Sequence, residues 1–121
     1  MDAKNADAYL KRGVAYVFQR QFDKAVADFG QAAKLAPENP AIYKERGSTY
    51  LLQGKSTEAL ADADNALKLA PDYGDALLLR AVAHEKLDRK DQAIADYRKV
   101  LTLEPSHQQS KDALKRLGAT P

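Results

Sequence analysis

The sequence predicts an all-α fold: a solenoid of three helical hairpins closed by a C-terminal capping helix, seven helices in all. The first observation behind this prediction is a repeat, because prolines recur every 34 residues at Pro37, Pro71 and Pro105. The second is a periodicity, since apolar residues recur three and four positions apart, as on one face of an amphipathic helix, without the alternation typical of strands. The third is the position of turn-forming residues, since residues such as Gly54 separate the periodic segments.

Three copies of the repeat span residues 6–39, 40–73 and 74–107 of a single domain that covers 1–121. The first two copies share thirteen identities over 34 aligned positions, more than chance alignment produces. The third copy is looser but keeps its alanine, aspartate and proline positions in register. One such unit cannot bury its own apolar face, so we expect the repeats to stack on one another.

In the first copy, helices are expected over 7–20 and 23–36. The first carries its apolar face on tyrosine and valine, and the second on phenylalanine, valine and alanine. These residues are Tyr9, Val14, Tyr16 and Val17, followed by Phe22, Val26, Phe29 and Ala33.

In the second copy, helices are expected over 40–53 and 56–70. Asn39 is a suitable N-cap for the first of them, because its side chain can accept a hydrogen bond from an unpaired backbone N–H. Pro40 then occupies the first helical position, where a missing N–H costs nothing. Gly54 marks the turn between the two helices.

In the third copy, helices are expected over 75–87 and 90–104, and a capping helix over 107–117 with Ser106 as its N-cap. A solenoid needs such a final helix because its last repeat would otherwise expose an apolar face. Three of its apolar residues are expected to face the third repeat and four of its charged residues to face water. They are Ala113, Leu114 and Leu117, and Lys111, Asp112, Lys115 and Arg116.

An arginine and an aspartate sixteen residues apart recur in every copy. Since the arginine falls on the first helix of the hairpin and the aspartate on the second, we predict an ion pair that joins the two helices of each repeat. The pairs are Arg12 with Asp28, Arg46 with Asp62, and Arg80 with Asp96.

The pattern as a whole resembles the tetratricopeptide repeat, a 34-residue helical hairpin with large residues at positions 4, 11 and 24, small residues at 8, 20 and 27, and proline at 32. The resemblance covers residues 6–107, departs from the pattern at Ala63, His84 and Val100, and implies a right-handed α-solenoid. The matching residues are Tyr9, Tyr43 and Leu77; Gly13, Gly47 and Ala81; Tyr16 and Tyr50; Ala25, Ala59 and Ala93; Phe29 and Tyr97; and Ala32 and Ala66.

Proteins of this family line a concave groove with the first helix of each repeat. The resemblance therefore implies a protein-interaction scaffold that binds a peptide segment or an amphipathic helix of another polypeptide in that groove. Several of these side chains could instead serve only to pack adjacent first helices together. The groove residues that it implies are Leu10, Lys11, Val14, Val17, Lys44, Glu45, Ser48, Leu51, Leu78, Val82 and Glu85.

Relatives that bind the C-terminal tail of a chaperone hold its carboxylate with lysine, asparagine and arginine side chains. The positions that match this clamp here carry no group that could donate to a carboxylate, and two of them are acidic. A chaperone tail is therefore not expected as the partner. The matching residues are Leu10, Val14, Glu45, Asp75 and Leu79.

Two other readings stay open. The apolar surface could face a second copy of the chain, which would make the protein a self-associating structural module or homo-oligomer. Alternatively, the array could be the interaction domain of a larger enzyme or of a secretion or assembly machine. The mass in solution tests the first alternative, and the intact gene tests the second.

Catalytic, metal and cofactor sites are not expected. The chain has no cysteine, and its two histidines, His84 and His107, are far apart in the sequence. His84 falls where the other copies carry tyrosine, so a packed aromatic substitute is expected there. Carboxylates alternate with lysine and arginine, as on solvated helix faces, and the chain lacks a glycine-rich phosphate loop and a Gly-x-Ser-x-Gly motif.

The net charge of +2 is too small to indicate a nucleic-acid partner. No apolar run approaches the roughly 18–20 residues that a membrane-spanning helix needs, so membrane insertion is not expected. The N-terminal pentapeptide, residues 1–5, lacks the apolar region of an export signal. Cytoplasmic location is favoured on these grounds. The Arg-Gly…Ala-x-x-Asp pattern without cysteine resembles bacterial members of the family, and this resemblance favours a bacterial source.

Overall fold

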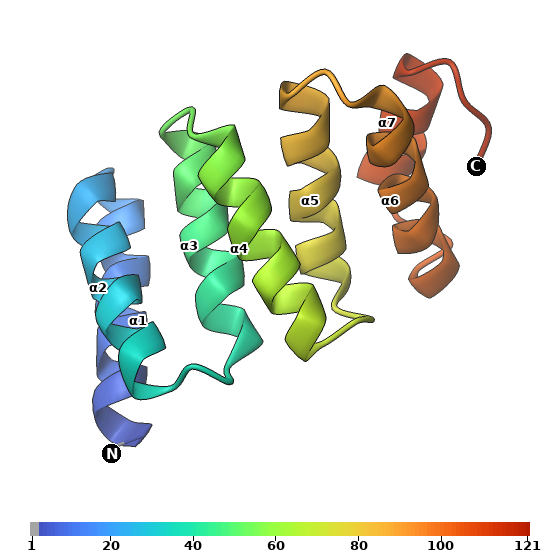
Figure 1. Ribbon diagram of the computed structural model, residues 1–121. Helices are drawn as coiled ribbons and strands as arrows, with labels where there is room; N and C mark the ends of the chain where they lie inside the picture. The colour runs from blue at the N-terminus through green and yellow to red at the C-terminus, as the bar shows by residue number, and fades with distance from the viewer. Residues whose placement is uncertain (1–2) are drawn as a thin grey trace.

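The structure, a computed structural model, describes residues 3–121; Met1 and Asp2, which begin the N-terminal pentapeptide, lie outside the described residues. Residues 3–121 form seven helices and no strand, so the predicted all-α solenoid is confirmed (Figure 1). The helices are α1 (Ala3–Phe18), α2 (Phe22–Leu35), α3 (Pro40–Leu52), α4 (Ser56–Leu69), α5 (Gly74–Lys86), α6 (Lys90–Leu103) and α7 (Gln108–Arg116).

Consecutive helices pair into three hairpins that stand side by side, with α7 against the last of them (Figure 1). Each hairpin packs on the next through its second helix, α2 on α3 and α4 on α5. The first helices also touch in order, α1 with α3 and α3 with α5. This contact places α1, α3 and α5 in one row, the row expected to line the groove.

The three hairpin turns share one backbone conformation. Arg20, Gly54 and Asp88, spaced by 34 residues, have φ angles of 59°, 76° and 59°. Only glycine adopts this left-handed conformation without a steric cost from its Cβ. The sequence therefore indicates the turn clearly in the second repeat, where the residue is Gly54, and less clearly in the other two.

The helix starts confirm one of the two predicted N-caps and correct the other. The Asn39 side chain accepts a hydrogen bond from the Ala41 N–H at 3.0 Å, and Pro40 follows at the first helical position, as predicted. At the start of α7, however, the cap is His107 and not Ser106, because His107 Nδ1 accepts from the Ser110 N–H at 3.2 Å. Helices α3, α4 and α6 begin where predicted, and the other helix ends differ from the predicted ones by one to four residues, most at the start of α1.

Small residues let the two helices of a hairpin approach closely. A Cβ added to Gly47 would lie 2.6 Å from Leu79 Cδ2 and 3.1 Å from Asp62 Cβ, so a larger residue would require these neighbours to move. Ala25, Ala59 and Ala93, at the matching position of the second helix, are all 0 % exposed. Close packing of this kind is what the repeat pattern requires.

The predicted arginine–aspartate pair is present in every repeat. Each arginine donates through Nε and Nη2 to the two oxygens of its aspartate, at 2.7–2.9 Å. The aspartates are almost fully buried. These two-point contacts tie the first helix of each hairpin to the second. The pairs are Arg12–Asp28, Arg46–Asp62 and Arg80–Asp96.

Candidate functional site

A hollow of about 260 Å³ lies between α3, α5 and the start of α7. It brings together five of the predicted groove residues, including the apolar side chains of Leu51, Leu78 and Val82. It also includes Asp75, Leu79 and Gln109, of which Gln109 was not foreseen. The complete lining is Lys44, Ser48, Leu51, Asp75, Leu78, Leu79, Val82 and Gln109.

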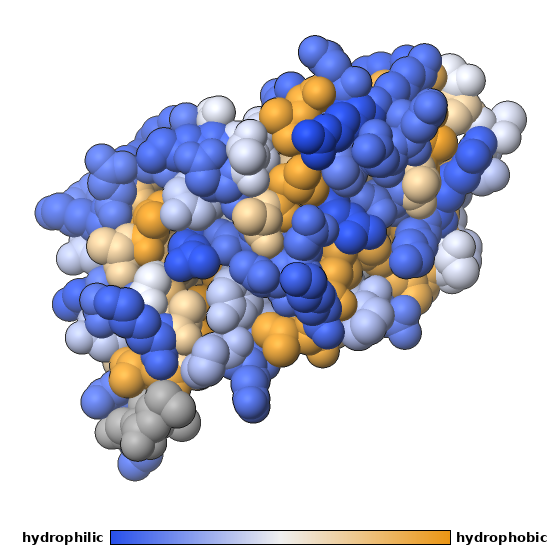
Figure 2. All heavy atoms as spheres, in the orientation of Figure 1, coloured by the Kyte–Doolittle hydropathy of each residue, from blue (hydrophilic) through white to orange (hydrophobic). Residues whose placement is uncertain are grey.

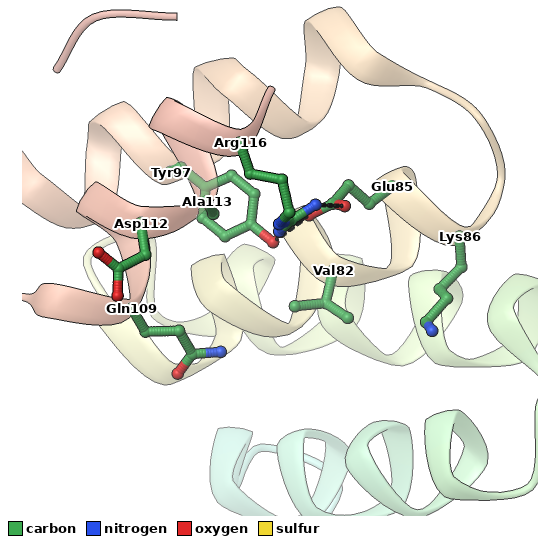
Figure 3. Close-up of a pocket in the computed structure, with 8 residues that line it drawn as sticks. All are labelled: Val82, Glu85, Lys86, Tyr97, Gln109, Asp112, Ala113 and Arg116. Carbon is green, nitrogen blue, oxygen red and sulfur yellow. Dashed lines mark hydrogen bonds and ion pairs between the residues drawn. The ribbon is translucent and has the colours of Figure 1, made fainter. Parts of the chain in front are cut away.

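A second, larger hollow of about 650 Å³ lies between α5, α6 and α7 (Figure 3). Val82 and Gln109 line both hollows, so the two adjoin. We call the two hollows together the C-terminal groove. The second hollow is lined by Val82, Glu85, Lys86, Tyr97, Gln109, Asp112, Ala113 and Arg116.

The predicted groove residues of the first repeat lie outside the C-terminal groove. Leu10, Val14 and Val17 are partly buried and pack against a core cluster that includes Phe29. Lys11 is exposed and forms an ion pair with Asp7, 3.0 Å away on the same helix. For the three apolar residues, packing within the array accounts for much of their surface.

Two pairs of charged side chains lie at the groove. Lys44 donates to Glu45, its neighbour in the chain. Partial burial of the Lys44 ammonium acts to lower its pKa, but the hydrogen bond and charge of Glu45 outweigh this, so the pKa lies above its ordinary value. At the opposite end, Arg116 of α7 donates through both Nη atoms to the Glu85 carboxylate (Figure 3).

Tyr97 also contacts Glu85, the partner of Arg116. Its hydroxyl donates to Glu85 Oε1 at 2.7 Å. The hydrogen bond from Arg116 holds the pKa of Glu85 below its ordinary value against the opposing effect of burial. Burial, followed by the contact with Glu85, raises the pKa of Tyr97 well above its ordinary value. The predicted groove residue Glu85 is therefore an anchor for the capping helix α7.

Two exposed apolar side chains extend the row at its hairpin end. Phe18 is 84 % exposed at the end of α1, and Leu52 is 57 % exposed at the end of α3. They occupy the same repeat position, next to the predicted residues Val17 and Leu51. Their signal was present in the sequence, because the family pattern directs this position toward the groove.

The remaining surface offers little other chemistry. In the view of Figure 2 the molecule is mainly hydrophilic, and hydrophobic residues show in strips between the helices. Among residues 3–121 there is no group of three or more His, Asp or Glu side chains that could hold a metal ion. None of the described helices is long and apolar enough to cross a membrane.

Comparison with known proteins shows which family and which solved structures this fold resembles. A tetratricopeptide repeat family model matches residues 10–66 and 46–110. The Arabidopsis OM64 TPR domain is 31 % identical with a TM-score of 0.94, and the match covers 96 % of each chain. The first TPR of Spaghetti (RPAP3), bound to an HSP90 peptide, is 27 % identical with a TM-score of 0.95, covering 98 % of this chain and 94 % of that one.

A third similar structure is the first TPR domain of human RPAP3, which is 26 % identical with a TM-score of 0.93, over 97 % of this chain and 92 % of that one. A comparison with curated protein sequences gives no match. The stacked hairpins and their row of first helices define a helical-repeat scaffold of the protein-interaction class. The chain belongs to the tetratricopeptide repeat family.

Proposed function

We propose that this protein binds an apolar segment or the apolar face of a helix from a partner polypeptide in the C-terminal groove. The observation that carries the proposal is the pairing of Lys44 and Arg116 beside partly buried apolar side chains. Lys44 and Arg116 each have an acidic partner within the molecule, whereas Leu51, Leu78 and Val82 are only partly buried. A groove with an apolar floor, whose Lys44 and Arg116 are already paired with acidic side chains, favours apolar ligands over acidic ones.

The size of the groove supports a polypeptide ligand. Its two adjoining hollows, of about 650 and 260 Å³, fall in or near the range of roughly 300–1,000 Å³ typical of ligand pockets, so each can receive one or more side chains. Phe18 and Leu52 continue the apolar surface beyond them. A segment that crosses the row of first helices would contact both parts.

The same argument opposes an acidic chaperone tail. The first TPR of Spaghetti was solved with the HSP90 peptide SRMEEVD, which is acidic. In this chain the clamp positions hold Asp75, which is exposed and repels a carboxylate, Glu45, which is paired with Lys44 and has no group to donate, and Leu79, which is 5 % exposed and packs inside the array. We expect SRMEEVD to give no saturable binding to this protein in isothermal titration calorimetry.

Affinity capture followed by mass spectrometry tests the groove. Val82→Glu places a charge where both hollows meet, and we expect it to remove the partner. Leu69→Glu is the matched control, because Leu69 is an exposed apolar residue at the end of α4, on a second helix. A partner held by the parent and by Leu69→Glu, but lost from Val82→Glu, supports the proposal.

The same samples distinguish the alternatives if their mass and helical content are measured. Capture that Val82→Glu leaves intact would contradict a binding site in the groove. A parent that is dimeric, with Val82→Glu monomeric, would show that the apolar surface faces a second copy. A Val82→Glu variant that has lost its helical circular dichroism is replaced by Gln109→Glu, at an exposed position that lines both hollows.

A further inference from the structure

One face of α1 is exposed although the same face is covered in the other two repeats. Ala8 and Ala15 are both exposed, whereas the residues at their positions in the second and third repeats are almost completely buried. Those counterparts are Ile42 and Ala76, each 0 % exposed, and Thr49 and Ala83, 1 % and 0 % exposed.

Arg12, which lies between Ala8 and Ala15, is likewise more exposed than its counterparts in the other two repeats. The side chain of Arg12 is 59 % exposed, against 22 % for Arg46 and 25 % for Arg80. All three make the same two-point contact with the aspartate of their own repeat, so that contact does not explain the difference. The difference comes from the preceding repeat, which covers Arg46 and Arg80.

In the third repeat the covering helix gives the arginine a second carboxylate. Arg80 Nη1 donates to Asp64 of α4 at 3.1 Å, in addition to its pair with Asp96. In the second repeat the equivalent position of α2 is Gly30, and a Cβ placed there would lie 4.0 Å from Arg46 Nη1. The same position of the covering helix therefore faces the arginine in both cases.

The face that α4 presents to α5 combines one carboxylate with apolar side chains. Ala63 and Leu60 belong to the cluster around Ala83, and Leu67 belongs to the cluster around Ala76. These residues and Asp64 fall at helical spacings of three and four, so they form one stripe. A carboxylate thus sits in the middle, with a large apolar side chain about one turn away on either side.

The open face of α1 carries a hollow beside Arg12. This hollow of about 320 Å³ is lined by Asn5, Ala8, Tyr9 and Arg12. The Arg12 guanidinium carbon lies 5.7 Å from the Tyr9 ring centre and 5.8 Å from that of Tyr16, and the rings flank it. In Arg80 the equivalent atom, Nη1, donates to Asp64. Within residues 3–121, Arg12 Nη1 has no hydrogen-bond partner.

We propose that the face of α1 formed by Ala8, Arg12 and Ala15 docks an amphipathic α-helix of a partner protein. That helix places a carboxylate on Arg12 and a large apolar side chain about one turn to either side, as α4 does on α5. This surface is separate from the C-terminal groove, and it adds a second contact of different chemistry.

Charge argues against a second copy of the chain as the occupant. The terminal helix α7 is the element that another copy would bring to α1 in a head-to-tail stack. Its exposed residues Lys111 and Lys115 outnumber its single acid, Asp112, and Arg116 is already paired with Glu85, so the helix is basic and repels Arg12. The second helices α2 and α4 already cover α3 and α5 within their own chain.

A peptide with the sequence of α4 can serve as the probe. A synthetic peptide of residues 56–69, stabilised as a helix by a cross-link between the exposed positions 57 and 61, keeps the stripe of α4 that contacts α5. We expect titration of this peptide into the full-length protein to shift the amide resonances of Ala8, Arg12 and Ala15. The corresponding faces of α3 and α5 are held by helices of the same chain and do not respond.

Three variants make the test specific. A peptide with Asp64→Lys should bind at least about tenfold more weakly, equivalent to a loss of about 1.4 kcal/mol. In the protein, Ala8→Glu fills the hollow and places a carboxylate one turn from Arg12, so the shifts should disappear. Ala27→Glu is the control, since Ala27 and its counterparts Ala61 and Ala95 are exposed in all three repeats.

Loss of binding with Asp64→Lys and Ala8→Glu, but not with Ala27→Glu, supports the docking face. Shifts confined to the C-terminal groove, or no shifts at millimolar peptide, would overturn it. So would shifts of Ala8 and Ala15 that depend on the concentration of the protein alone, because they would identify the occupant as a second copy. Val82→Glu leaves this binding unchanged, so the outcome is independent of the groove.

Discussion

At the scale of single residues, the pairing of arginine with aspartate is the contact that the sequence predicts best. The sixteen-residue spacing recurs in three copies, and a helical hairpin brings two such positions face to face. The same reasoning misses the bond between Arg116 and Glu85, which joins the third repeat to the capping helix and occurs once. A single pair without a repeated spacing gives no signal, and its partners depend on how α7 is oriented.

Asp62→Asn tests the pairs within the repeats. Asp62 is 3 % exposed and receives two hydrogen bonds at 2.9 Å from Arg46. The amide keeps the shape but loses the charge and turns one acceptor into a donor. We expect a loss of about 1–3 kcal/mol in the free energy of unfolding, measured by urea denaturation. An unchanged unfolding midpoint would show that the pair contributes no stability.

His84 gives the protein a predictable response to pH. Its side chain is mostly buried, and Nδ1 has no hydrogen-bond partner among residues 3–121. Burial lowers the pKa of His84; Asp96, 3.9 Å from Nε2, and Asp64 oppose the shift, while Arg80 and Arg89 support it. The unfolded chain therefore takes up a proton first as the pH falls, and stability drops as the pH falls through the unfolded-state value of about 6.5.

His84→Tyr should reduce this dependence, because Tyr16 and Tyr50 occupy the same position in the other repeats. The measurement is the urea midpoint of parent and variant at about pH 7.5 and pH 5.5, on either side of the ordinary histidine pKa. His107 is present in both proteins and cancels in the comparison. A variant that loses as much stability as the parent would assign the pH effect to other groups.

At the scale of elements, the three hairpin turns share one backbone conformation, but only one of them carries the glycine that would indicate it in the sequence. All three turns require a positive φ, and only the second has glycine there. Aligning the repeats extends this conformation to Arg20 and Asp88, although neither residue type would predict it alone. The cap of α7 could not be inferred in this way, because Ser106 and His107 both offer an acceptor and their choice depends on the local backbone.

We expect Arg20→Gly and Asp88→Gly to stabilise the protein by about 1 kcal/mol each, since glycine removes the contact between Cβ and the following carbonyl oxygen. The gain is reduced by the greater freedom of glycine in the unfolded chain. Gly54→Ala, at the same position of the second repeat, should destabilise by a similar amount. Thermal unfolding of the three variants measures the effects, and a gain for Gly54→Ala would contradict the common conformation.

At the scale of the whole molecule, the two ends of the solenoid differ. At the C-terminal end α7 covers the third repeat with Ala113 and Leu114, as the sequence predicts from their spacing. At the N-terminal end the equivalent face of α1 is open. The spacing of apolar residues predicts which faces are buried between repeats, but not which end surface stays exposed, because the same repeat positions serve both.

This asymmetry predicts how the molecule opens when its capping helix is weakened. Leu114 is 0 % exposed and packs with Tyr97 and Leu101 of α6, so Leu114→Ala should cost about 2–4 kcal/mol of local stability. In a solenoid each repeat contacts only its neighbours, so the loss is felt most where the contact is broken. Hydrogen exchange followed by mass spectrometry should therefore show faster exchange in α7 and α6, a smaller change in α5, and none in α1 and α2. Equal acceleration in all helices would show instead that three repeats open as one cooperative unit, in which the capping helix stabilises the first repeat as much as the last.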